Sequence, residues 1–175
     1  MATDQHERSI DELVRIMAVL RAPDGCPWDR EQTHMSLRKH LVEEAYEAVA
    51  AIEAGDDAEM TDELGDILLQ VVFHAQIASE DGRFDIDDVA EAIVTKLRRR
   101  HPHIFADAIA DTPAQVMERW DRIKRTEKSG GLLDGIAPTL PALTMAEKIS
   151  RRAVSVGFEW ETVEDVLDNV HEEID

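Results

Sequence analysis

Two pairs of acidic residues have a spacing that could bind a metal ion. Glu44 and Glu47 belong to the pattern E-E-x-x-E that begins at Glu43, and Glu63 and Asp66 form the pattern E-x-x-D. Residues three apart on a helix lie on the same face. Four carboxylates brought together repel one another unless a cation neutralises them. The spacing therefore predicts a metal site made by Glu44, Glu47, Glu63 and Asp66.

The donor atoms of this expected site are all carboxylate oxygens. Neither acid pair supplies the histidine that di-iron helical bundles place three residues after a glutamate. Oxygen donors favour hard cations, so we expect Mg²⁺, with Mn²⁺ as a substitute. Such a site leaves positions for water and for substrate phosphates, which is the chemistry of phosphoryl transfer. Either pair alone would be better explained as surface acids that flank a buried stripe, whereas two pairs on consecutive helices favour the metal site.

A basic cluster and two tryptophans could bind the phosphates and the base of a nucleotide. Four of the five residues from Lys96 to Arg100 are basic, and Lys96, Arg99 and Arg100 could hold phosphates. The same residues could instead complement the dipole at the end of a helix. Trp120 and Trp28 are candidates for stacking on a base, although Trp120 also fits a core position.

The apolar residues recur with helical periodicity along almost the whole chain, and no segment alternates as a strand would. We therefore predict an all-α fold. One helix is expected to begin near Thr33 and to end at Gly55, and the next to run over about 57–79. A short turn would make them antiparallel and bring the four acids to one level. The expected inward stripes are Leu37, Leu41, Ala45, Val49 and Ile52, and Leu64, Leu68, Val71, Val72 and Ala75.

The composition excludes several classes of protein. The chain has 175 residues, of which 38 are acidic and 19 basic, giving a net charge of −19. This charge argues against binding to a nucleic-acid polymer. The single cysteine, Cys26, excludes an internal disulfide and a multi-cysteine zinc site. No signal peptide or long apolar run is evident, so we expect a cytoplasmic globular protein with no membrane contact.

Taken in order, the motifs resemble the MazG family of nucleoside triphosphate pyrophosphohydrolases. The acid pairs alone would indicate only the wider all-α NTP pyrophosphatase superfamily, which also includes dimeric dUTPases. The further motifs narrow the resemblance to MazG. The matching segments are 25–29 (GCPWD), 43–47 (EEAYE), 63–66 (ELGD), 96–105 (KLRRRHPHIF), Trp120 with Ile123 and Lys124, 133–136 (LDGI) and 156–160 (VGFEW).

The resemblance implies a helical bundle whose core is completed by a homodimer, or by a higher homo-oligomer. It also implies Mg²⁺-dependent cleavage of NTPs or dNTPs between the α and β phosphates, giving a nucleoside monophosphate and pyrophosphate. By position, the implied metal ligands are Glu44, Glu47, Glu63 and Asp66. Glu43 and Glu44 would be catalytic, with Glu43 as an accessory acid that orients water or supports the ligands. Lys96, Arg99 and Arg100 would contact phosphates, and Trp120 the base.

A second feature concerns the organisation of the chain. The segment 40–47 (HLVEEAYE) is similar to 169–175 (NVHEEID), where the third acid of the pattern is missing. We therefore expect a MazG-like domain at 1–128, a linker and connecting helix at 129–161, and at 162–175 the start of a truncated second copy.

Three functions follow from these patterns. The first is a house-cleaning or regulatory hydrolase of nucleoside triphosphates. The second is a non-catalytic dimerisation or nucleotide-binding module of a two-domain protein. Metal storage or sensing is a weaker third, because it gives the basic cluster and the tryptophans no role.

Overall fold

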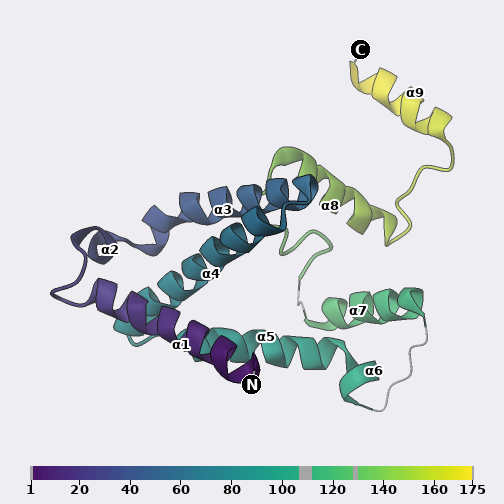
Figure 1. The fold of residues 1–175 in the computed structure, drawn as a ribbon. Helices are drawn as coiled ribbons and strands as arrows, with labels where there is room; N and C mark the ends of the chain where they lie inside the picture. The colour runs from purple at the N-terminus through teal and green to yellow at the C-terminus, as the bar shows by residue number, and fades with distance from the viewer. Residues whose placement is uncertain (1, 107–111, 128–129, 175) are drawn as a thin grey trace. The chain divides into compact units, whose positions relative to one another are not determined.

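The chain folds into helices joined by loops of different lengths (Figure 1). The computed structural model describes residues 2–106, 112–127 and 130–174, and this part of the chain contains no strand. The all-α prediction is therefore confirmed. The helices are α1 (Ala2–Arg21), α2 (Pro27–Glu31), α3 (His34–Ala54), α4 (Asp57–Glu80), α5 (Ile86–Arg100), α6 (Pro102–Phe105), α7 (Pro113–Glu127), α8 (Ala142–Val154) and α9 (Val163–Ile174).

The chain divides into two units, residues 1–99 and 100–175, and each is described by itself. In the first unit, α4 packs against α3 and α1. The core between these helices is apolar, and its buried members are Met17, Leu37, Val72, Phe73 and Ile77. Burial of such side chains contributes roughly 1.5–3 kcal/mol each. This core holds α3 and α4, the helices with the acid pairs, in a fixed relation.

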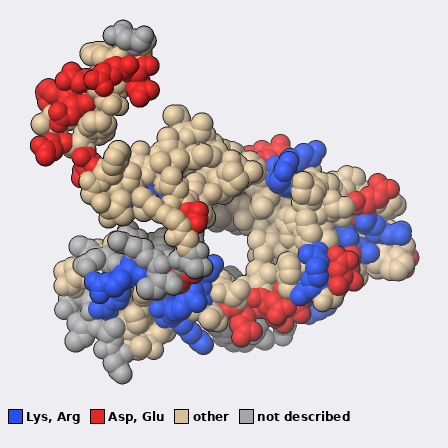
Figure 2. Space-filling view, turned by 180° about the vertical axis from the view of Figure 1, so that it is seen from behind, with Lys and Arg blue, Asp and Glu red and all other residues tan. Residues whose placement is uncertain are grey.

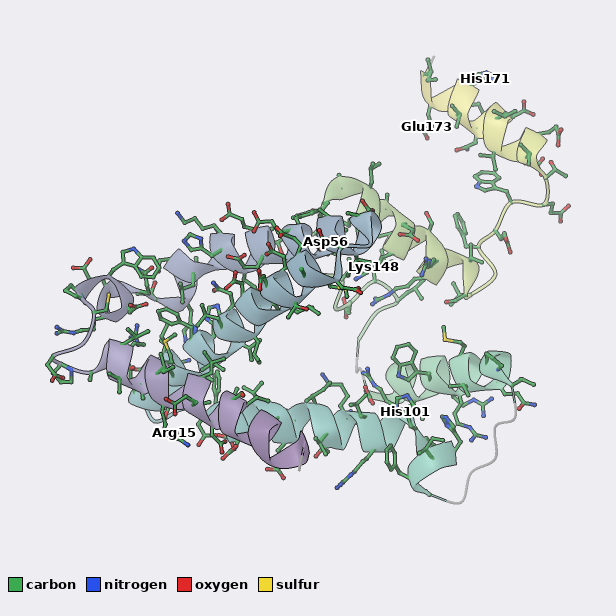
Figure 3. The ribbon with its side chains drawn as sticks, in the orientation of Figure 1. Arg15, Asp56, His101, Lys148, His171 and Glu173 are labelled. Carbon is green, nitrogen blue, oxygen red and sulfur yellow. The ribbon has the colours of Figure 1, made fainter. Side chains whose placement is uncertain are left out.

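A two-residue turn joins α3 to α4 and sets their register. Gly55 adopts a positive φ of 67°, a conformation that glycine tolerates without strain. The amides of Gly55 and Asp56 donate to the carbonyls of Ile52 and Ala51, which closes the end of α3. The Asp56 carboxylate then accepts from the amides of Ala58 and Glu59 and caps α4. Figure 3 labels Asp56 at this turn. The expected antiparallel pair is thus confirmed.

The faces of α3 and α4 that meet are not the ones expected from the apolar stripes. Ala48 and Ala51 are buried between the helices, and their small side chains allow a close approach. The prediction that the stripes point inward is wrong for several residues, which remain between 37% and 57% exposed: Leu41, Val49, Ile52, Leu64 and Leu68. Each helix therefore has a second apolar face that the described residues leave partly exposed.

A tight connection links α1 to α2. The amide of Gly25 donates to the carbonyl of Ala22, and that of Cys26 to the carbonyl of Leu20. A Cβ atom at Gly25 would lie 2.3 Å from the Leu20 carbonyl oxygen. Only glycine fits so close to another backbone segment, and this explains the glycine two residues before α2.

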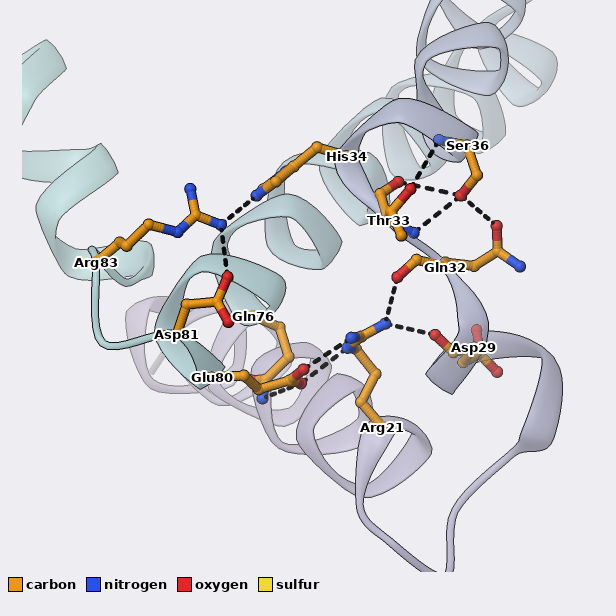
Figure 4. A network of polar contacts seen from close by, with 10 residues as sticks. All are labelled: Arg21, Asp29, Gln32, Thr33, His34, Ser36, Gln76, Glu80, Asp81 and Arg83. Atoms are coloured by element: carbon orange, nitrogen blue, oxygen red, sulfur yellow. Dashed lines mark hydrogen bonds and ion pairs between the residues drawn. The ribbon is translucent and has the colours of Figure 1, made fainter.

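Arg21 fastens this connection to α4 (Figure 4). Its side chain is only 7% exposed and donates two hydrogen bonds to the Glu80 carboxylate, at 2.8 and 2.7 Å. It also donates to the carbonyls of Asp29 and Gln32 and lies over the ring of Phe73. Hydrogen bonding from Arg21 is the main reason that the pKa of Glu80 is lowered. One side chain therefore joins α1, α2 and α4.

Two histidines connect the start of α3 to α4. The rings of His34 and His74 are nearly parallel, and their Nδ1 atoms are 2.8 Å apart. The Arg83 guanidinium, which can only donate, lies 2.7 Å from Nε2 of His34 and also donates to Asp81. Neutral His34 must therefore carry its proton on Nδ1 and donate it to His74. This chain of hydrogen bonds requires both histidines to be neutral.

The histidine pair predicts that stability depends on pH. Burial lowers the pKa of His74, and the neighbouring His34 lowers it further. The unfolded chain, with a histidine pKa of about 6.5, then binds more protons than the folded protein as pH falls. The contribution of His74 to stability is therefore present above about pH 6.5 and is lost below it.

The test compares wild type with His74→Phe by urea unfolding between about pH 7.5 and 5.5. We expect the free energy of unfolding of the wild type to fall more steeply than that of the variant. Acids with a raised pKa act in the opposite direction, but they are present in both proteins and cancel in the difference. Equal pH dependence of the two proteins would contradict the prediction.

The second unit contains α6 to α9. Here Arg152 on α8 donates to the carbonyls of Leu132 and Asp134 and holds the loop before α8. Acidic side chains cover much of α9 (Figure 2). The expected domain boundary at 128/129 lies outside the described residues, and so does Asp175. Among the described residues, no helix combines the length and apolar character needed to cross a bilayer.

Candidate metal centre between α3 and α4

Three of the four expected ligands converge in the structure. Glu44 on α3 and Glu63 and Asp66 on α4 each offer a carboxylate oxygen, and these oxygens lie within 4.8 Å of one another. Glu44 and Glu63 are half-buried, whereas Asp66 is exposed. The turn at Gly55 produces this arrangement, because it places the two E/D pairs opposite each other on antiparallel helices.

The fourth expected ligand, Glu47, lies at the edge of this group. It lines a cavity of about 300 Å³ that continues from Glu63 toward the turn. The other residues lining the cavity are Ala50, Ala51, Ala54, Asp56 and Glu59. The sequence did not single out Asp56 and Glu59 for this position, although their place at the N-cap and in the first turn of α4 was a usable signal.

Two of the carboxylates have a raised pKa, which means that their charged forms are disfavoured when no cation is present. The pKa of Glu44 is raised mainly by burial. A hydrogen bond to Glu47 and the negative charges of nearby acids raise it further. Burial also raises the pKa of Glu63, followed by the charges of neighbouring acids, Glu47 first. A bound cation would reverse both effects by neutralising the charges.

An oxygen atom of Glu63 gives a second, independent indication of a cation site. Oε2 of Glu63 is buried and has no hydrogen-bond partner. A buried carboxylate oxygen without a partner is costly. The oxygens of Glu44, Glu63 and Asp66 are donors suited to a hard divalent cation. The residues present therefore fit a metal of this kind.

Glu43 is placed differently from the three converging acids. Its side chain is 60% exposed, and its Oε2 lies 3.4 Å from Nδ1 of His40. The structure thus leaves Glu43 outside the three-carboxylate group but next to it along α3. Sequence reasoning did not consider His40, although a histidine three residues before an acid on a helix is a recognisable pair.

The basic residues are divided between the two units. Lys96 and Arg99 are exposed near the end of α5, in the first unit. In the second unit, Arg100 donates to both carboxylate oxygens of Glu127, at 3.2 and 2.6 Å. This hydrogen bonding raises the pKa of Arg100, whose guanidinium lies 5.9 Å from the centre of the Trp120 ring. The structure therefore places Arg100 near Trp120, and it already gives Arg100 an anionic partner in Glu127.

A family comparison agrees with this arrangement. Residues 32–105, which include both acid pairs, match the MazG nucleotide pyrophosphohydrolase domain. Residues 32–105 are thus similar to a MazG domain, in agreement with the resemblance that the motifs indicated.

Particular relatives extend the similarity over most of the chain. A nucleoside triphosphate pyrophosphohydrolase of Escherichia coli K12 is 48% identical over 171 residues, covering 95% of this chain and 65% of that protein. A Thermotoga maritima protein named nucleoside triphosphate pyrophosphohydrolase/pyrophosphatase MazG is 48% identical, with 94% and 64% covered. A Mycobacterium tuberculosis nucleoside triphosphate pyrophosphohydrolase is 38% identical, with 94% and 50% covered. The chain therefore spans between half and two thirds of the length of these relatives.

The fold also has a counterpart among solved structures. The crystal structure of a mazG-related protein from Thermotoga maritima aligns with a TM-score of 0.55 and 24% identity. The alignment covers 66% of this chain and 98% of that chain. At this identity the similarity concerns the fold alone.

Proposed function

We propose that this protein is a divalent-metal-dependent hydrolase that cleaves nucleoside triphosphates between the α and β phosphates. The observation that carries the proposal is the convergence of Glu44, Glu63 and Asp66 in a MazG domain, with a buried Glu63 oxygen that lacks a partner. The names of the relatives support the same class of substrate.

In this proposal Glu44, Glu47, Glu63 and Asp66 hold the cation, with Mg²⁺ preferred and Mn²⁺ as a substitute. When bound, the cation would neutralise charge on the phosphates and would make the attacking water more acidic. Glu43 orients this water and accepts its proton. The water oxygen forms a bond to the α phosphorus, the bond to the bridging oxygen breaks, and its electron pair leaves with pyrophosphate. Lys96, Arg99 and Arg100 hold the phosphates, and Trp120 contacts the base.

A panel of NTPs and dNTPs tests the reaction, in Mg²⁺ or Mn²⁺, with pyrophosphate and orthophosphate measured separately. We expect pyrophosphate and the nucleoside monophosphate in equal amounts. Release of orthophosphate alone would contradict cleavage between the α and β phosphates. Binding of nucleotide without release of either product would favour a non-catalytic module, since the chain spans only part of its relatives.

We also propose that a second copy of the chain covers the exposed apolar faces of α3 and α4. Leu41, Val49, Ile52, Leu64 and Leu68 form these faces, which flank the acid pairs on both helices. Contiguous exposed apolar surface of this kind is typical of a protein interface. Sedimentation equilibrium should give twice the chain mass of 19.7 kDa, or a higher multiple, and Val49→Asp should reduce it. A wild-type monomer would overturn the proposal.

The start of α9 supports the proposed organisation into one domain, a linker and the beginning of a second copy. Thr162 and Asp165 cap α9 reciprocally, as Thr33 and Ser36 cap α3. With Thr162 aligned to Thr33, the acid aligned to Glu44 is Glu173. The two helices therefore begin with the same capping pattern and reach an acid at the same distance from it.

A further inference from the structure

Trp28 is a large aromatic side chain that is exposed and yet held in place. Its residue is 54% exposed on the short helix α2. The Gln32 side chain donates to the Trp28 carbonyl at 2.9 Å, and Arg21 donates to the carbonyls of Asp29 and Gln32. The backbone around the indole is therefore fixed by two side chains, one of them buried. Among the described residues, the packing leaves more than half of this fixed residue exposed.

His40 connects this indole to the proposed metal centre. The Trp28 and His40 rings meet edge to face, with centroids 6.4 Å apart and an angle of 62°. Nδ1 of His40 lies 3.4 Å from Oε2 of Glu43. His40 is also one helical turn before Glu44, and a turn rises about 5.4 Å. The indole thus lies beside His40, and His40 is about one helical turn before Glu44 on α3.

We propose that Trp28 stacks on the nucleobase of the substrate, with His40 fixing the orientation of the indole. The proposal rests on the proposed function, since the phosphates must lie at the carboxylates. One helical turn is comparable to the length of the ribose between an α phosphate and its base. The exposed indole then offers a flat apolar face where the base must lie.

This assignment also concerns specificity. Stacking tolerates every base, because each has a π face, and it provides no pattern of hydrogen bonds to distinguish them. Trp28 therefore contributes affinity for nucleosides in general and little discrimination among bases. Trp120, whose ring lies near the Arg100 guanidinium in the second unit, remains a second proposed contact to the base.

The experiment measures Trp28→Ala and Trp28→Phe against Trp160→Ala, a control that removes another exposed tryptophan. For Trp28→Ala we expect KM for NTPs to rise about 10- to 100-fold, similarly for all bases, with kcat changed only a few-fold. Trp28→Phe should recover part of the loss, and Trp160→Ala should behave as wild type. Calorimetry with a nonhydrolysable nucleotide should show the same loss of affinity.

Inorganic triphosphate, which lacks both base and sugar, separates stacking from general damage. Its inhibition constant should be the same in wild type and Trp28→Ala. Equal weakening of nucleotide and inorganic triphosphate would overturn the proposal, as would unchanged nucleotide affinity. A loss of oligomer mass in Trp28→Ala would instead make Trp28 a subunit contact. If wild type binds nucleotide but releases no pyrophosphate, the proposed function fails, while Trp28→Ala still tests the stacking.

Discussion

Replacing Glu44 by Gln is expected to reduce pyrophosphate release by at least about 100-fold. The variant keeps the shape of the side chain but removes one of three converging negative charges. The remaining carboxylates, Glu63 and Asp66, would hold a divalent cation more weakly. Steady-state kinetics over a range of Mg²⁺ concentrations measures the loss.

The same variant should behave in the opposite way when stability is measured without metal. Burial and neighbouring charges raise the pKa of Glu44, so the folded protein favours the neutral form, which Gln imitates. Glu44→Gln is therefore expected to melt at a higher temperature than wild type in a chelator. Added Mg²⁺ or Mn²⁺ should stabilise wild type and have a much smaller effect on the variant.

Glu53→Gln is the matched control, because Glu53 is an exposed acid on the same helix and outside the three-carboxylate group. It removes the same charge from the chain and should leave both the turnover and the metal-induced stabilisation unchanged. If Glu44→Gln turned over substrate like this control, Glu44 would not belong to the metal site. If both variants lost activity, a general effect of net charge would be indicated.

The placement of these acids could be predicted because it depends on local rules. A spacing of three residues puts Glu63 and Asp66 on one face of any helix. Gly55 followed by Asp56 forms a helix stop and a helix start in two residues, which forces α3 and α4 to run antiparallel. The level at which the acid pairs meet then follows from the length of chain between them.

The direction of the apolar stripes could not be predicted in the same way. Periodicity shows that α3 has apolar faces, but it does not distinguish burial within the chain from burial against another molecule. Ala48 and Ala51 pack against α4, whereas Val49 and Ile52 remain exposed. The small alanines determine which face of α3 packs against α4, because they allow the two helices to approach more closely than branched side chains do.

Contacts between distant segments were also beyond the reach of the sequence. Arg21 and Glu80 are 59 residues apart, and neither has a neighbour pattern that identifies the other. The contact between Trp28 on α2 and His40 on α3 could not be predicted from the sequence either. Such contacts depend on how the helices pack, which local spacing does not determine.

Arg21→Met is expected to destabilise the first unit by about 3 kcal/mol, because breaking a buried ion pair leaves its partner uncompensated. The variant leaves the Glu80 carboxylate without its main donor and also removes the donor to the carbonyls of Asp29 and Gln32. Glu80 is 35% exposed, so water relieves part of the cost, and the value lies at the lower end of the range for buried pairs. Urea unfolding measures the change.

The double variant Arg21→Met with Glu80→Gln separates the charge from the packing. Removing both charges leaves no buried carboxylate without a partner, so the double variant should be more stable than Arg21→Met alone. It should not reach wild type, because the carbonyls of Asp29 and Gln32 still lack their donor. If Arg21→Met lost less than about 1 kcal/mol, the pair would behave as an exposed salt bridge. In that case the contacts of Arg21 would contribute little to holding α2, which carries Trp28, against α4.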